Sequence, residues 1–221
     1  MFNPDPFLAI LRVIQFIILL TFHEWGHAKA ALVLGDSTAK DENRLTLNPA
    51  AHIDPLGTVL LPLLGSFFGG VFFGWAKPVP VNPLQLKDPK RDLMIIAAAG
   101  PVMNLICTFV ILAIVRLLDE TLGSAVHREI YGQLRLLALI SVFLAAFNMI
   151  PLFPLDGFSV VYGLLPWKQA QQFERLRPYG MMILLGILFL PDLLRIPNPV
   201  FFVLEIVSFG TFNLLRNLVG L

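Results

Sequence analysis

The chain has 221 residues, of which 57% are hydrophobic and 14% are charged, and its mean hydropathy is +0.77. Soluble domains carry roughly 25% charged residues, so these values exclude an ordinary soluble globular protein. The formal net charge of +1 provides no clustered basic face, and we therefore expect no nucleic-acid partner. The composition predicts a protein whose surroundings are the lipid bilayer.

Five apolar stretches are predicted to form membrane helices, at residues 7–33, 93–118, 130–150, 179–194 and 200–219. Most of them reach the ~20 residues that cross a hydrocarbon core of about 30 Å. The fourth is short and needs flanking residues to span. The first lacks the basic start and the small-residue cleavage site of a signal peptide, so we interpret it as a retained helix.

Residues 56–74 are apolar but rich in helix-breaking residues. These are Gly57, Pro62, Gly65, Gly69, Gly70 and Gly74. Such a pattern predicts a re-entrant hairpin or a short strand element shielded by protein. The expected fold is therefore an all-α polytopic membrane protein of about five membrane helices plus this element. We expect one domain, 1–221, with the catalytic core at about 7–165 and C-terminal helices at 179–221.

The distribution of basic residues supports a re-entrant path for residues 56–74. With that path, one side of the membrane carries Lys40, Arg44, Lys77, Lys87, Lys90, Arg91, Lys168, Arg175 and Arg177. The opposite side carries little beyond Arg128 and Arg195. The positive-inside rule then predicts an N-terminus outside the cell, with residues 34–92 in the cytosol.

The sequence FHEWGH at residues 22–27 carries the chemistry of the first predicted helix. One helical turn separates His23 from His27, about 6 Å along the axis, so both imidazoles can reach one metal ion. Glu24 is rotated by about 100° from His23, which lets it flank the metal and accept a proton from water. Ionisable groups within a membrane helix are costly to bury and usually mark a functional site, so we favour a zinc site over a polar cluster without function.

Two histidines leave a catalytic zinc site one ligand short, since such sites usually take three protein ligands and keep one position open. The candidates for the third are His52, Asp54, Glu120, His127, Glu129 and Asp156. Those between the second and third spanning stretches are too far away, because His23 and His27 lie about 24–30 Å along the first helix from Phe7. Asp156 emerges on the side of the histidines if residues 56–74 are re-entrant. Ligand geometry and charge asymmetry thus require the same topology.

Two motifs, FHEWGH at 22–27 and NMIPLFPLDG at 148–157, resemble the site-2 protease family of intramembrane zinc metalloproteases. The segments LNPAAHIDPLG at 47–57, GWAKPVP at 74–80 and AGPVMN at 99–104 are similar to further parts of compact bacterial and archaeal members, which lack PDZ and CBS domains. The resemblance covers most of the catalytic core.

The resemblance implies that His23, His27 and Asp156 bind one zinc ion and that Glu24 is the general base. It also implies that the substrates are transmembrane segments of other proteins, cut within or near the bilayer. A substrate helix is expected to unwind and add an extended segment beside residues 56–74.

Two further residues are candidates for substrate binding or oxyanion stabilisation. Asn148 can donate a hydrogen bond to the substrate backbone or to the developing oxyanion, or it can bond a carbonyl freed by Pro151. Three roles are open to His52: a fourth ligand, a substrate-clamping group or an ordinary loop histidine. We favour a supporting role, because a fourth protein ligand would close the site. The alternative function is a membrane metal transporter or metal-binding channel, which would favour more ionisable groups along the spans than this sequence has.

Overall fold

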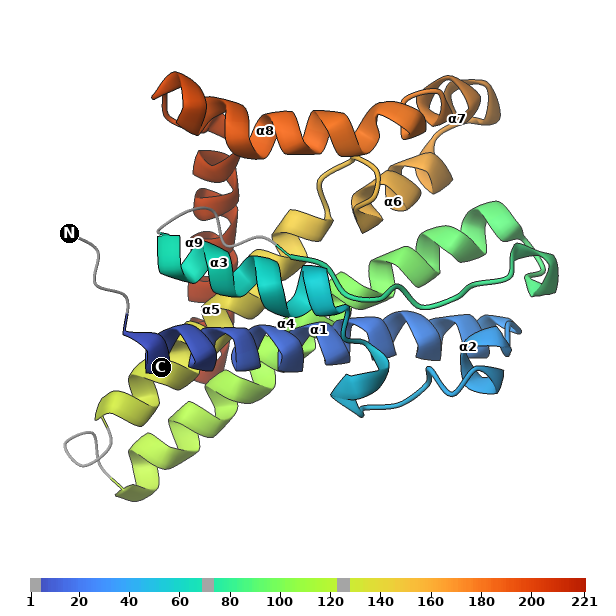
Figure 1. Cartoon of the computed structure of the whole chain (residues 1–221). Coiled ribbons are helices and arrows are strands. Elements are labelled where there is room, and N and C mark those ends of the chain that lie inside the picture. Colours follow the sequence, from blue (N-terminus) through green and yellow to red (C-terminus); the bar gives the residue numbers. More distant parts are fainter. Residues whose placement is uncertain (1–4, 69–73, 123–127) are drawn as a thin grey trace.

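The computed structural model describes residues 5–68, 74–122 and 128–221, and every regular element in these ranges is helical (Figure 1). The elements are α1 (Pro6–Leu34), α2 (Thr38–Asp41), η1 (Pro49–Ala51), η2 (Pro55–Leu60), α3 (Leu61–Phe68), η3 (Pro83–Gln85), α4 (Pro89–Leu122), α5 (Arg128–Asn148), α6 (Asp156–Leu164), α7 (Trp167–Glu174), η4 (Arg177–Tyr179), α8 (Gly180–Leu194) and α9 (Pro199–Val219). The predicted all-α class is confirmed.

Four helices are long and apolar enough to cross a membrane: α1, α4, α5 and α9. They correspond to four of the five predicted stretches. The remaining stretch, 179–194, corresponds to α8, which is helical as expected but has 15 residues and is therefore about 22 Å long. This is shorter than a hydrocarbon core of about 30 Å, which agrees with the short stretch in the sequence.

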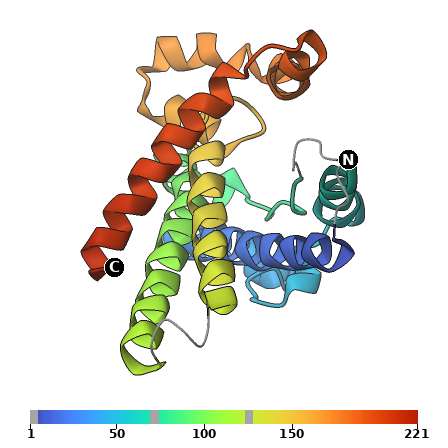
Figure 2. The same ribbon diagram turned by 90° about the vertical axis from the view of Figure 1, so that its left-hand side faces the viewer.

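Helix α4 is the centre of the fold and packs against α1, α5, α6 and α9. Half of its most apolar window is buried inside the protein, whereas only 17% of the corresponding window of α9 is buried. Figure 2 shows α9 on the flank of the α4 and α5 pair. The apolar residues of α9 therefore face the lipid for the most part, and those of α4 form the protein core.

Small residues and internal hydrogen bonds bring the spanning helices together. A Cβ atom on Gly26 of α1 would lie 2.8 Å from the Ala99 carbonyl oxygen of α4, so only glycine permits this approach. Between α4 and α5, the Ser141 hydroxyl donates to the Asn104 carbonyl at 2.7 Å, and the Thr108 hydroxyl contacts the Ala138 carbonyl at 3.3 Å. These buried hydroxyls are satisfied within the protein, as a lipid environment requires.

Residues 55–68 form η2, a turn of π-helix, followed by α3, so this part of residues 56–74 is helical and not the short strand that was one of the two expectations. Residues 69–73 lie outside the described residues. The helical start has a local cause: Pro55 occupies the first turn, and the Asp54 carboxylate caps it by accepting the N–H groups of Leu56 and Gly57. Gly57 permits close packing, because a Cβ atom there would meet the Trp75 indole.

Both ends of this element lie together. The N–H of Trp75 donates to the Gly57 carbonyl at 3.1 Å, and that of Lys77 donates to the His52 carbonyl at 2.9 Å. The chain that leaves at residue 55 has therefore come back beside its own starting point by residue 75. This arrangement is the one that a re-entrant path requires.

Asp36, just beyond α1, fastens residues 74–82, which we call the connector, to the end of that helix. Its buried carboxylate accepts hydrogen bonds from the Thr38 N–H at 3.0 Å, the Thr38 hydroxyl at 2.6 Å and the Asn82 N–H at 2.7 Å. Burial alone would raise the pKa of Asp36, but the hydrogen bonds from Thr38 and Asn82 outweigh it and hold the pKa below its ordinary value.

Asp36→Ala is expected to lower the free energy of unfolding by about 1–3 kcal/mol, because it leaves buried donors without an acceptor. Since the folded-state pKa of Asp36 is depressed, its stabilisation is present above the unfolded-state pKa of 3.8 and is lost as the pH falls through the lower folded-state value. Thermal unfolding in detergent at neutral and acidic pH measures both effects.

Asp41→Ala is the matched control for this prediction. Asp41 is exposed and accepts a hydrogen bond from the Ser37 hydroxyl at 2.7 Å. Its removal is expected to change the free energy of unfolding by less than about 0.5 kcal/mol. Equal destabilisation by the two substitutions would show that Asp36 has no special role.

Candidate metal centre

Helix α1 presents two histidines side by side. The Nε2 atoms of His23 and His27 lie 3.1 Å apart, with the ring centroids 4.6 Å apart and the rings edge to face. Both residues are buried, with relative exposures of 4% and 8%. The i, i+4 spacing on a helix thus places both imidazoles on one face of α1, turned toward α4 and α6.

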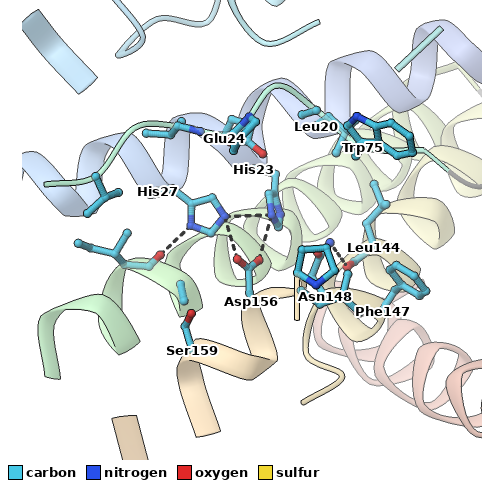
Figure 3. A pocket seen from close by; sticks show the side chains of 18 of the residues that line it. Leu20, His23, Glu24, His27, Trp75, Leu144, Phe147, Asn148, Asp156 and Ser159 are labelled. Carbon is cyan, nitrogen blue, oxygen red and sulfur yellow. Dashed lines mark hydrogen bonds and ion pairs between the residues drawn. The ribbon is translucent and has the colours of Figure 1, made fainter. Parts of the chain in front are cut away.

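Asp156, the first residue of α6, meets the two histidines. Its Oδ2 lies 3.1 Å from His23 Nε2, and its Oδ1 lies 3.4 Å from His27 Nε2 (Figure 3). One donor atom from each residue lies within 4.8 Å of the other two. In residues 5–68, 74–122 and 128–221, this is the only such group of histidine, cysteine and acidic side chains. His127, an earlier candidate, falls outside these ranges.

Two contacts direct Asp156 toward the histidines. Gly157 lies so close to the preceding loop that a Cβ atom would meet the carbonyl oxygens of Met149 and Ile150. At the other end of α6, the Lys90 ammonium donates to the Gly163 carbonyl at 2.8 Å and to the Leu165 carbonyl at 2.6 Å. A cation at a helix C-terminus is favourable, so Lys90 attaches α6 firmly to the start of α4.

Gly100 of α4 leaves the space that the two imidazoles occupy. A Cβ atom on Gly100 would lie 2.7 Å from His23 Cε1 and closer still to the His27 ring. Real Cβ atoms essentially never approach other atoms so closely. The histidines and α4 can therefore pack together only with glycine at this position.

The three donors fit a zinc ion. His27 Nδ1 lies 2.7 Å from the Ile96 carbonyl oxygen, so Nδ1 carries the proton and the Nε2 lone pair of the neutral ring faces the other donors. Tetrahedral zinc with bonds of about 2.0–2.1 Å keeps its ligand atoms about 3.4 Å apart. The two Nε2 atoms lie 3.1 Å apart, and each lies 3.1 or 3.4 Å from a different oxygen of the Asp156 carboxylate, which is close to that value. A cation bound here would satisfy lone pairs that otherwise repel one another.

Glu24 lies beside this group without belonging to it. Its side chain is 8% exposed, and its Oε2 accepts a hydrogen bond from the Val79 N–H of the connector at 3.1 Å. A carboxylate next to a metal centre but bonded elsewhere can take a proton from water, which is the role that the sequence predicts for Glu24.

A cavity of about 450 Å³ opens onto the three donors and Glu24. One wall is the connector, and another is formed by the end of α5 and by Met181 and Leu184 of α8. In both overall views α8 lies well separated from α1 (Figures 1 and 2). The lining is mostly apolar, so the few polar groups inside it define where chemistry can occur.

Of the two other predicted site residues, Asn148 lines the cavity and His52 does not. The Asn148 Nδ2 donates to the Leu144 carbonyl at 3.0 Å, which leaves its second N–H for another acceptor. His52 is 1% exposed, and its Nε2 lies 2.8 Å from the Thr46 carbonyl oxygen. Its own carbonyl holds Lys77, so the contacts of His52 support the connector.

Other contributors to the site were missed by the sequence analysis. Gly100 was noted only within AGPVMN, because its contact with the histidines joins distant parts of the chain. Ile96 and Val79 act through backbone atoms, for which the side-chain pattern gives no signal. Asp54, considered there as a ligand, instead caps η2.

The comparisons with known proteins agree with one another and point to metalloproteases. The model of peptidase family M50 matches residues 117–191. "Putative zinc metalloprotease YwhC" of Bacillus subtilis is 33% identical over 84% of this chain and 81% of its own length. Rip2 of Mycolicibacterium smegmatis, named in the same way, is 26% identical over 84% of this chain and 69% of its own length. No solved structure matches.

A polytopic helical fold around a His, His and Asp donor group defines a membrane-embedded metalloprotein. With the extent of the match to YwhC, the chain belongs to peptidase family M50, the site-2 protease family of intramembrane zinc metalloproteases. It is a multi-pass membrane protein and a zinc metalloendopeptidase whose substrates are membrane proteins. Nothing in the comparisons favours the alternative of a metal transporter.

Gly100→Ala is expected to lower zinc affinity at least about tenfold, because the added methyl group displaces both imidazoles. Competition with a chromophoric chelator, together with the zinc content of the purified protein, measures this loss. Gly132→Ala is the matched control, since a Cβ atom there has nothing within 4 Å. Unchanged zinc affinity in the Gly100 variant would mean that the metal is not bound by these histidines.

Proposed function

We propose that His23, His27 and Asp156 hold the zinc ion and that Glu24 is the general base of peptide hydrolysis, within a single catalytic domain spanning 1–221. The observation that carries this proposal is the convergence of three donor atoms within 4.8 Å beside a buried carboxylate. It rests also on the His27 tautomer set by the Ile96 carbonyl, which leaves Nε2 free to bind a metal.

The chemistry of the chain's own residues follows from their positions. Zinc, when bound, lowers the pKa of water and polarises a carbonyl. Glu24 takes the proton of the attacking water and passes it to the leaving amide nitrogen. Asn148, with one N–H already bonded to Leu144, offers the other to the substrate backbone or to the developing oxyanion. His52 contributes by holding the connector in place.

We propose that the substrate binds as an extended segment along the connector. On one edge of the connector, the backbone N–H and carbonyl of Trp75 are bonded to Gly57 and Thr58. On the same edge, the N–H and carbonyl of Lys77 are bonded to His52 and Arg44. This alternation is that of an extended chain, which directs the backbone groups of Ala76 and Pro78 to the opposite edge. Both residues line the cavity. A peptide unwound from a helix can pair with that edge and bring its carbonyl to the metal centre.

For the topology, we propose an N-terminus outside the cell and an active site near the cytosolic side. Helix α2, the loop before α4, and α7 gather at one end of the molecule, away from the start of α1 (Figure 1). These segments and the residues that flank them in the sequence carry nine of the 16 Lys and Arg residues: Lys40, Arg44, Lys77, Lys87, Lys90, Arg91, Lys168, Arg175 and Arg177. The positive-inside rule assigns that end to the cytosol. The return of the chain from Gly57 to Trp75 supports the re-entrant path on which this assignment depends.

Glu24→Gln is expected to abolish cleavage of a helical test substrate in reconstituted membranes while leaving one zinc ion per chain, because the amide cannot accept the proton but the ligands remain. Gel-based cleavage and elemental analysis measure the two properties. Asp156→Ala should reduce bound zinc in parallel. Zinc lost from the Glu24 variant, or full zinc in the Asp156 variant, would reassign the ligands.

The topology predicts which side of the membrane each segment faces. In a Cys107→Ala background, Gln85→Cys is expected to react with a membrane-impermeant maleimide only when the cytosolic face is accessible, since Gln85 is exposed in the loop before α4. Glu120→Cys, exposed near the far end of α4, is the control and should react only from the opposite side. Labelling of both from one side would contradict the proposed orientation.

A further inference from the structure

The Glu24 carboxylate is anchored by a backbone group. Its Oε2 accepts the Val79 N–H at 3.1 Å, and this is the only hydrogen bond to that carboxylate in the described part of the chain. A glutamate side chain rotates about three single bonds, so one fixed oxygen restricts where the other oxygen lies. The contact therefore determines the direction in which Glu24 faces the cavity.

The sequence around Val79 makes its N–H a unique donor. Pro78 and Pro80 flank it and have no N–H, so Val79 carries the single backbone donor of residues 78–80. A shift of the connector by one residue would leave Glu24 facing a proline. The pairing of Val79 with Glu24 is thus defined by the sequence in a way that side-chain motifs do not reveal.

The register of the connector is held on both sides of Val79. On one side, the Lys77 N–H donates to the His52 carbonyl at 2.9 Å, and the Lys77 carbonyl accepts from the buried Arg44 guanidinium at 2.7 Å. On the other side, the Asn82 N–H donates to Asp36 at 2.7 Å. With these anchors, Val79 stays opposite Glu24 whether or not a substrate occupies the other edge.

We infer that the Val79 main-chain N–H is a positioning group for the general base, and that the connector thereby couples the base to the substrate edge. This inference rests on the proposed function of Glu24. With Oε2 held, Oε1 is left to accept the proton of the attacking water. The same short segment fixes the base on one edge and receives the peptide on the other, so a correctly paired peptide meets a correctly directed carboxylate.

An amide-to-ester replacement at Val79 tests this inference directly. Incorporation of the α-hydroxy acid analogue of valine by nonsense suppression removes the N–H and keeps the side chain. We expect kcat for a helical substrate in proteoliposomes to fall at least about tenfold with one zinc ion per chain, because metal ligation is untouched. The ester also weakens the Pro78 carbonyl as an acceptor on the substrate edge, so KM is expected to rise, but by less than kcat falls. A kcat within about twofold of the control overturns the inference, as does a loss of kcat that is matched by loss of zinc.

The matched control is the same ester at Val81, on the same edge two residues further on, whose N–H has no acceptor among the described residues. Its kcat should equal that of the unmodified protein. Should the ester proteins fold poorly, Val79→Pro against Val79→Ala makes the same comparison, since only proline removes the N–H. Equal kcat in these two variants also overturns the inference.

Glu24→Gln, assayed in parallel, separates this inference from the function on which it rests. Cleavage by the glutamine variant would refute Glu24 as the base. No cleavage by that variant, with full activity of the Val79 ester, would refute only the positioning role.

Discussion

The structure depends on one constraint: two buried histidine nitrogens and the carboxylate of Asp156 lie within 4.8 Å of one another inside a membrane helix bundle. Acceptor atoms only 3.1 to 3.4 Å apart repel one another when no proton or cation lies between them. A bound cation turns this repulsion into ligation. The protein must therefore hold the donors rigidly enough that they cannot separate, and several otherwise unrelated packing features serve that purpose.

Helix α4 sets most of these positions. Its Gly100 admits the imidazoles, its Ile96 carbonyl fixes the His27 tautomer, and its Lys90 holds the far end of the helix that begins with Asp156. All three contacts come from the first four turns of one helix. A rigid α4 thus fixes α1 and α6 relative to each other, although none of the three donor residues belongs to α4.

The sequence predicted the helices and the donor residues better than it predicted the packing between them. The spans follow from hydropathy, and the histidine pair follows from the helical repeat, both of which are local signals. The glycines of residues 56–74 were interpreted as helix breakers because their packing partners, such as Trp75 for Gly57, are not sequence neighbours. The contact of Val79 with Glu24 could not be predicted from the sequence, because Val79 contributes a backbone N–H. Long-range contacts and main-chain atoms leave little trace in a single sequence.

The depth of the site reconciles hydrolysis with a lipid environment. Helix α1 has 29 residues and is about 43 Å long, more than the hydrocarbon core needs. His27 lies seven residues before its last residue, Leu34, which is about 10 Å along the axis. In the proposed topology this is the cytosolic end of the helix, so water would enter the site from that polar end and an unwound substrate would arrive from the lipid. The connector contacts Glu24 at Val79, His52 at Lys77 and Asp36 at Asn82, so the proposed function assigns to one extended segment the contacts with the base, the peptide and the polar loops.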